Sequence, residues 1–155
     1  MLSRIQKSEN AQELFLLLFR LWMGLTMIGH GKLLFEKSEW PFFISRFGDE
    51  LHLPAPLIVF FFAKGSEFLG GILISFGLFT RIAAAFIVFT MVAATLAANR
   101  HQIYSGEGAI TISFMLFAFV LMLFGSGHWS LDHFLSRRKE KNKVKAFSDV
   151  AKKIF

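Results

Sequence analysis

The stretch LIVFFFAKGSEFLGGILISFGLF, from Leu57 to Phe79, decides the fold. A run of about 20 mainly apolar residues is long enough to cross a bilayer as a helix. Lys64 and Glu67 lie near its middle, three residues apart and therefore on one helical face. Because a charge in the bilayer core costs roughly 2.5–3.5 kcal/mol or more, such residues usually face a bundle interior beside a partner. Three glycines near the pair favour close contacts between helices: Gly65, Gly70 and Gly71.

The composition indicates an all-α membrane protein that crosses the bilayer several times. Of the 155 residues, 54% are hydrophobic, and the 21 phenylalanines fall in successive apolar runs. The chain has no cysteine, which excludes thiol catalysis, disulfide relays and cysteine-ligated clusters within it. The net charge of +6 is concentrated near the C-terminus, beside a membrane helix, and therefore does not indicate nucleic-acid binding.

The apolar runs predict an antiparallel bundle of four transmembrane helices. The expected spans cover about residues 11–34, 57–79, 81–99 and 108–124, within a membrane domain of residues 1–136. A very short turn joins the second and third spans, which makes them antiparallel neighbours. The segment between Phe35 and Pro56 mixes charged and aromatic residues and predicts a short interfacial helix. Pro54 or Pro56 marks the start of the second span.

The remaining residues, 137–155, form a basic tail. Its lysines and arginines alternate with apolar residues at helical spacing, which predicts an amphipathic helix on an anionic leaflet. Basic residues near span ends mark the cytoplasmic side, and Arg81 lies in the short turn between spans. Four spans therefore place both termini in the cytoplasm. Arg20, near the start of the first span, is expected to reach the interface by snorkelling.

This orientation collects polar residues from all four spans in one zone that opens outward. The candidate ligand-binding residues are Glu67, Lys64, His30, Lys32, His101 and Glu107. Helices that converge on shared ionisable residues are how bundles build internal sites. The alternative is a structural ion pair of Glu67 with Lys64 or Lys32 that only fixes helix register. The histidines lack HxxxH or HxH spacing, so no metal site is predicted.

Three signatures resemble the DoxX family of small four-helix membrane proteins. They are RLWMG (20–24) continuing to GHGKL (29–33), EFLGG (67–71) followed by GLFTR (77–81), and GSGHWSLD (125–132). The resemblance implies a bacterial inner-membrane protein associated with redox chemistry. Family members have been linked to thiosulfate:quinone oxidoreduction, to quinone and electrophile resistance, and to an oxidative-stress complex with superoxide dismutase and a sulfurtransferase. The resemblance implies no catalytic residue set.

Two functions are compatible with these residues. The first is a subunit of a quinone-linked oxidoreductase that binds a quinone or similar amphiphile in the outer half of the bundle. Lys64, Lys32, His30 and His101 would donate to the carbonyls and Glu67 would carry protons, while electrons come from a redox partner or a bound cofactor. The second is a non-enzymatic scaffold or small-molecule carrier, in which an apolar pair can replace the charged pair. A homo-oligomer is a further expectation, because four helices bury little interior.

Overall fold

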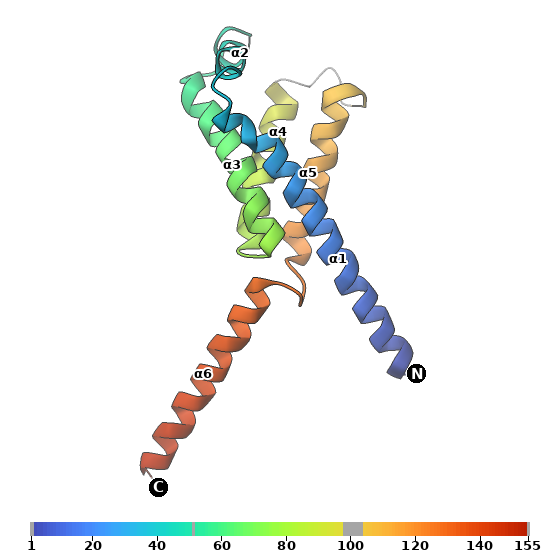
Figure 1. Ribbon diagram of the computed structural model, residues 1–155, viewed down its shortest axis with the longest axis vertical. Helices are drawn as coiled ribbons and strands as arrows, with labels where there is room; N and C mark the ends of the chain where they lie inside the picture. Colours follow the sequence, from blue (N-terminus) through green and yellow to red (C-terminus); the bar gives the residue numbers. More distant parts are fainter. Residues whose placement is uncertain (1, 51, 98–103, 155) are drawn as a thin grey trace.

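The computed structural model of the chain is helical over most of its length (Figure 1) and describes residues 2–50, 52–97 and 104–154. Side chains are described for residues 9–49, 52–96 and 104–144. The elements in chain order are α1 (Leu2–Gly31), the 3₁₀ helix η1 (Lys32–Phe35), α2 (Trp40–Ser45), the π-helical η2 (Arg46–Glu50), α3 (Pro56–Phe76), α4 (Thr80–Ala97), α5 (Gly106–Phe124) and α6 (Leu131–Ile154).

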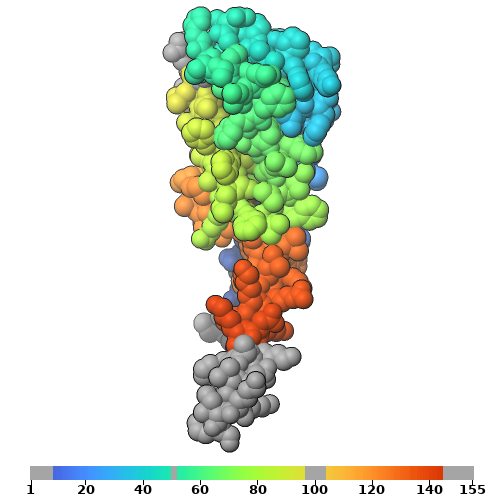
Figure 2. All heavy atoms as spheres, turned by 90° about the vertical axis from the view of Figure 1, so that its left-hand side faces the viewer, coloured from blue at the N-terminus to red at the C-terminus, as the bar shows by residue number. Residues whose placement is uncertain are grey.

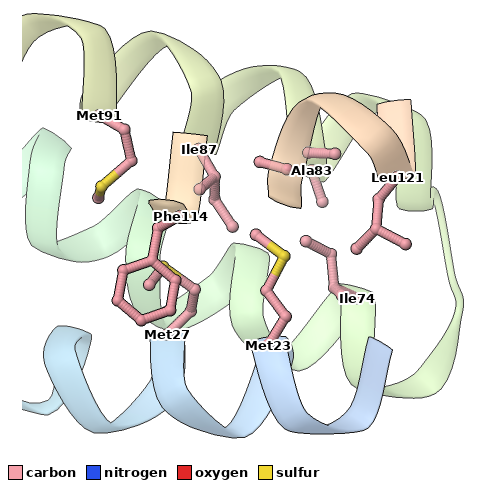
Figure 3. Packing of buried hydrophobic residues seen from close by; sticks show 10 residues of the cluster. Met23, Met27, Ile74, Ala83, Ile87, Met91, Phe114 and Leu121 are labelled. Carbon is pink, nitrogen blue, oxygen red and sulfur yellow. The ribbon is translucent and has the colours of Figure 1, made fainter. Parts of the chain in front are cut away.

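Four long helices, α1, α3, α4 and α5, share one hydrophobic core (Figure 3). α1 packs against α3, α3 against α4, and α4 against α5. Each of the four contributes at least one fully buried side chain, as Met23, Ile74, Ile87 and Leu121 show. Large apolar side chains also cover the outside, including the exposed Phe89. An apolar core inside an apolar surface is the arrangement expected of helices surrounded by lipid.

Glycines allow α1 and α3 to cross at very close range. A Cβ atom on Gly71 would lie 2.6 Å from the carbonyl oxygen of Gly24 and 2.8 Å from the amide nitrogen of Ile28. Gly70 faces α4, where its Cβ would lie 3.1 Å from Cδ1 of Ile87. The predicted close approach is therefore confirmed at Gly70 and Gly71, whereas a Cβ on Gly65 would meet open space.

Three helices within the described ranges are long and apolar enough to cross a membrane: Glu9–Phe35, Pro56–Phe76 and Gly106–Phe124. A fourth apolar helix, Thr80–Leu96, is shorter. α3 starts at Pro56, which is one of the two starts that the sequence predicts. It ends at Phe76, before the expected Phe79, because Gly77 takes the left-handed conformation that caps a helix.

Both termini lie beyond the same end of the packed helices, while α2 lies at the opposite end (Figure 1). α6 leaves the packed helices, and the space-filling view shows how the molecule narrows there (Figure 2). Ser130 caps α6, because the amide of His133 donates to its hydroxyl oxygen at 3.2 Å. α6 contains the predicted basic residues from 137 onward.

Candidate functional site

The predicted pairing of Lys64 with Glu67 is confirmed. The Lys64 Nζ atom lies 2.8 Å from the Glu67 Oε2 atom, and the two side chains are only 13% and 8% exposed. The residues stand one helical turn apart on α3, on the face that it turns toward the other packed elements. A buried pair of this kind is stable only when both charges are present, since removal of one leaves the other uncompensated.

Aromatic side chains cover the pair on the side of α2. This aromatic roof consists of Trp40 and Phe43 from α2 and Phe60 and Phe61 from α3. The Lys64 ammonium lies 5.5 Å from the Phe43 ring centroid, within the range of a cation–π contact. Phe43 lies 5.8 Å from Phe60, and Trp40 lies 4.9 Å from Phe61, between ring centroids. The aromatic residues that the sequence places between the first two spans therefore pack onto α3.

The indole nitrogen of Trp40 has no hydrogen-bond acceptor among the described residues, although the atom is buried. A buried polar group without a partner costs on the order of 1–3 kcal/mol. Native proteins rarely leave such a donor without an acceptor, and a bound small molecule or water is a common partner. The aromatic roof therefore contains a donor that is available to a bound acceptor.

The other candidates from α1 do not join this pair. Lys32 instead lies 3.6 Å from Glu36, one turn further on, and both side chains are well exposed. His30 is exposed and packs edge to face against Phe114 of α5, with 5.6 Å between the ring centroids. α1 ends at Gly31, and the 3₁₀ helix η1 that follows packs against α3. The Lys32 ammonium nevertheless pairs with Glu36, and Glu67 pairs with Lys64.

Two candidates remain from the far ends of α4 and α5. Glu107 lies 3.8 Å from Arg46 of η2, and its side chain is largely exposed. It therefore ties the start of α5 to the segment after α2 and does not contact the Lys64–Glu67 pair. His101 lies outside the described residues. Within the described ranges, no three side chains of His, Asp or Glu are placed to hold a metal ion.

Arg20 has a role that the sequence analysis missed. Its side chain is 2% exposed and donates to the carbonyl oxygens of Ser126 and, at 2.8 Å, Trp129. The expectation that it snorkels to the interface is therefore wrong. The chain between α5 and α6 lies across this part of α1. Its carbonyl groups have no hydrogen-bond partner within a helix, so the Arg20 guanidinium donates hydrogen bonds to them. The first and third family signatures both include this contact.

Two carboxylates, Asp132 and Glu13, lie at the same end of the molecule as Arg20 and accept hydrogen bonds from backbone amides. Asp132 accepts hydrogen bonds from the amides of Phe79 at 2.9 Å and Thr80 at 3.2 Å, and its own amide donates to Gly77. Glu13 accepts from the amide of His128 at 2.6 Å. Both carboxylates are close enough to Arg20 to interact with its charge. We call this cluster of Arg20, Glu13, Asp132 and their partners the inner junction.

An apolar groove of about 360 Å³ runs between α3 and α4. It is lined by Phe61, Gly65 and Leu69 of α3 and by Phe86 of α4, among others. Lys64 and Glu67 do not line it, because they lie on a different face of α3. Phe61 belongs both to the groove and to the aromatic roof, so the two features meet at the Trp40 end of α3.

These features define the class of protein: a multi-pass helical membrane protein with a buried ion pair in one of its spans. The family model described as DoxX matches residues 15–100, more than half of the chain, and the chain belongs to the DoxX family. It is also similar to a Bacillus subtilis (strain 168) protein named "Putative oxidoreductase CatD", with 28% identity over 134 residues that cover 86% of this chain and 96% of that protein. No solved structure matches the chain.

Proposed function

We propose that this DoxX-family protein is a membrane subunit of a quinone-linked redox system. It binds a quinone, or a similar amphiphile with carbonyl groups, at the aromatic roof and the adjoining groove between α3 and α4. The observation that carries the proposal is the buried, unpartnered indole nitrogen of Trp40 in the aromatic cluster that also contacts Lys64. The family, and a relative whose printed name is an oxidoreductase, support the link to redox chemistry.

The residues present suit such a ligand. A quinone needs hydrogen-bond donors for its carbonyl oxygens and an apolar path for its tail. The Trp40 indole N–H is one donor, and the Lys64 ammonium is another, because only one of its three N–H groups is needed for Glu67. The groove between α3 and α4 begins at Phe61 and provides an apolar path from the aromatic roof.

The roles in this proposal are limited to binding and proton transfer. A bound quinone supplies the capacity to accept electrons, which this chain's own side chains lack. Lys64 and Trp40 would orient the carbonyls, and Glu67 would hold and release a proton at its carboxylate. Lys32, one of the predicted donors, has its own partner in Glu36 and takes no part here.

We also propose that all four long helices cross a bacterial inner membrane as an antiparallel bundle. The apolar helix from Thr80 to Leu96 in α4 is 17 residues long, which is near the lower limit for a span. Both termini, the start of α4 with Arg81 and the basic helix α6 lie at one end, which the positive-inside rule assigns to the cytoplasm. The aromatic segment from α2 to η2 would then lie at the outer interface.

Glu67→Gln and Lys64→Met should each lower the quinone content of the gently purified protein at least fivefold. Native mass spectrometry and optical spectra of the same sample measure this content. Trp40→Phe should have a similar effect because it removes the donor and keeps the ring. Trp22→Phe is the matched control, since Trp22 stacks on Phe114 away from the roof. Equal quinone content in all four variants would overturn the proposal.

A non-enzymatic scaffold or carrier is the second candidate function. The ion pair of Lys64 and Glu67 favours this function, because the two charges compensate each other within one helix and need no ligand. The double variant Lys64→Met with Glu67→Leu separates the two candidates, because it removes both charges together and keeps the side-chain volume. A scaffold should retain its oligomeric state, partner binding and growth phenotype in this variant, whereas a quinone-binding subunit should lose quinone.

A further inference from the structure

A polar hollow of about 280 Å³ lies next to the inner junction, at the end of the molecule opposite the aromatic roof. It lies between the start of α4, the end of α5 and the first turns of α6. Its lining includes Arg81 of α4, Phe124 of α5, the chain from 125 to 127, and His133 of α6. The functions considered above do not use this hollow.

Arg81 is the principal cation of the hollow. One of its terminal nitrogens donates to the carbonyl oxygen of Leu123 at 3.3 Å, which is the single hydrogen bond it has among the described residues. Gly125 lies against the guanidinium, because a Cβ atom there would be 3.2 Å from Arg81 Nε. The group is therefore positioned by the end of α5 while most of its five N–H donors are available for an anion.

The carboxylate of Asp132 also lines the hollow but does not make it an acidic site. It accepts the amide hydrogens of Phe79 and Thr80, and it lies close enough to Arg20 to interact with that charge. The next basic residues along α6, Arg137 and Arg138, are exposed. The surroundings of Arg81 therefore favour an oxyanion such as a phosphate group.

The apolar neighbours of the hollow indicate which phosphate it suits. Phe124 lines the hollow and is 71% exposed. Phe79 and Ile82, which flank Thr80 and Arg81 at the start of α4, do not line the hollow but are also exposed. Inorganic phosphate would use the charge of Arg81 alone. A phospholipid would bring its phosphate to Arg81 and its acyl chains to these side chains, at the level where span ends meet the headgroups.

We propose that this hollow binds the headgroup of an anionic phospholipid, with Arg81 as the residue that holds the phosphate. Native mass spectrometry of the full chain released from nanodiscs that contain phosphatidylglycerol and phosphatidylcholine tests the site. Arg81→Gln should reduce the retained phosphatidylglycerol at least fivefold. Arg138→Gln, which removes the same charge from α6 outside the hollow, should change it less than twofold. Excess inorganic phosphate should not displace the lipid from the unmodified protein.

Three results would overturn the proposal: equal losses in the two variants, no loss in Arg81→Gln, or equal retention of phosphatidylcholine. Hydrogen exchange of the unmodified protein gives an answer even if Arg81→Gln does not fold. Phosphatidylglycerol should slow the exchange of amides 125–133 relative to phosphatidylcholine, because the bound headgroup covers them. The same exchange in both lipids would exclude the site.

Discussion

Replacement of Arg20 by methionine should lower the free energy of unfolding by about 3 kcal/mol, because a buried charge that holds three parts of the chain is lost. The guanidinium satisfies the carbonyl oxygens of Ser126 and Trp129 and balances Asp132 and Glu13. Methionine fills a similar volume but leaves the two carbonyl oxygens without their donor and removes the charge that faces the two carboxylates. Reversible unfolding by denaturing detergent in mixed micelles measures the change.

Arg138→Met is the matched control for this substitution. Arg138 is exposed on α6, so the loss of its charge should change the free energy of unfolding by less than about 0.5 kcal/mol. The Arg20 variant should also loosen the chain between α5 and α6, which faster hydrogen exchange at residues 125–132 would show. If both variants unfold alike, the inner junction does not stabilise the protein.

A side chain at Gly71 should also be strongly destabilising, by about 3 kcal/mol for valine and somewhat less for alanine. A Cβ atom there would lie 2.6 Å from the carbonyl oxygen of Gly24 and 2.8 Å from the amide of Ile28. Both are backbone atoms of α1, so no side chain can rotate away and the two helices must separate. Unfolding in mixed micelles measures the loss, and the melting temperature should fall with it.

Gly65 provides the control on the same helix. A Cβ atom at this position meets nothing within 4 Å, so Gly65→Ala should be neutral or stabilise the protein by up to about 1 kcal/mol through helix propensity. A large loss in Gly65→Ala, or none in Gly71→Ala, would mean that α1 and α3 do not cross where the structure places them.

The local features of the fold follow from the sequence. The apolar run from Leu57 to Phe79 predicts α3, and Pro56 is one of its two predicted starts, although Gly77 caps the helix before the expected end. The spacing of Lys64 and Glu67 places them on one helical face, so Lys64 is one of two partners that the sequence offers Glu67, and the structure selects it over Lys32. Small residues likewise predict that helices come close at Gly70 and Gly71, though not which helices these are.

The wider outward-opening zone could not be predicted so well. It collects Lys32 and Glu107 in one zone with Glu67, whereas Lys32 pairs with Glu36 and Glu107 pairs with Arg46. These choices depend on where α1 ends and how the segment from α2 to η2 folds back. Hydrophobic periodicity does not contain that information, because it describes helix faces and not the path of the connections between helices.

By itself, the sequence determined the apolar helices, the family resemblance and Lys64 as one possible partner of Glu67, since all depend on residues close together in the chain. Only the tertiary structure decided that Arg20 is buried and that Trp40 lies unpartnered above α3. Arg20 meets Trp129 across 109 positions of sequence. A contact of that range is set by how the helices pack and where their connections lie, and neither residue alone indicates its partner.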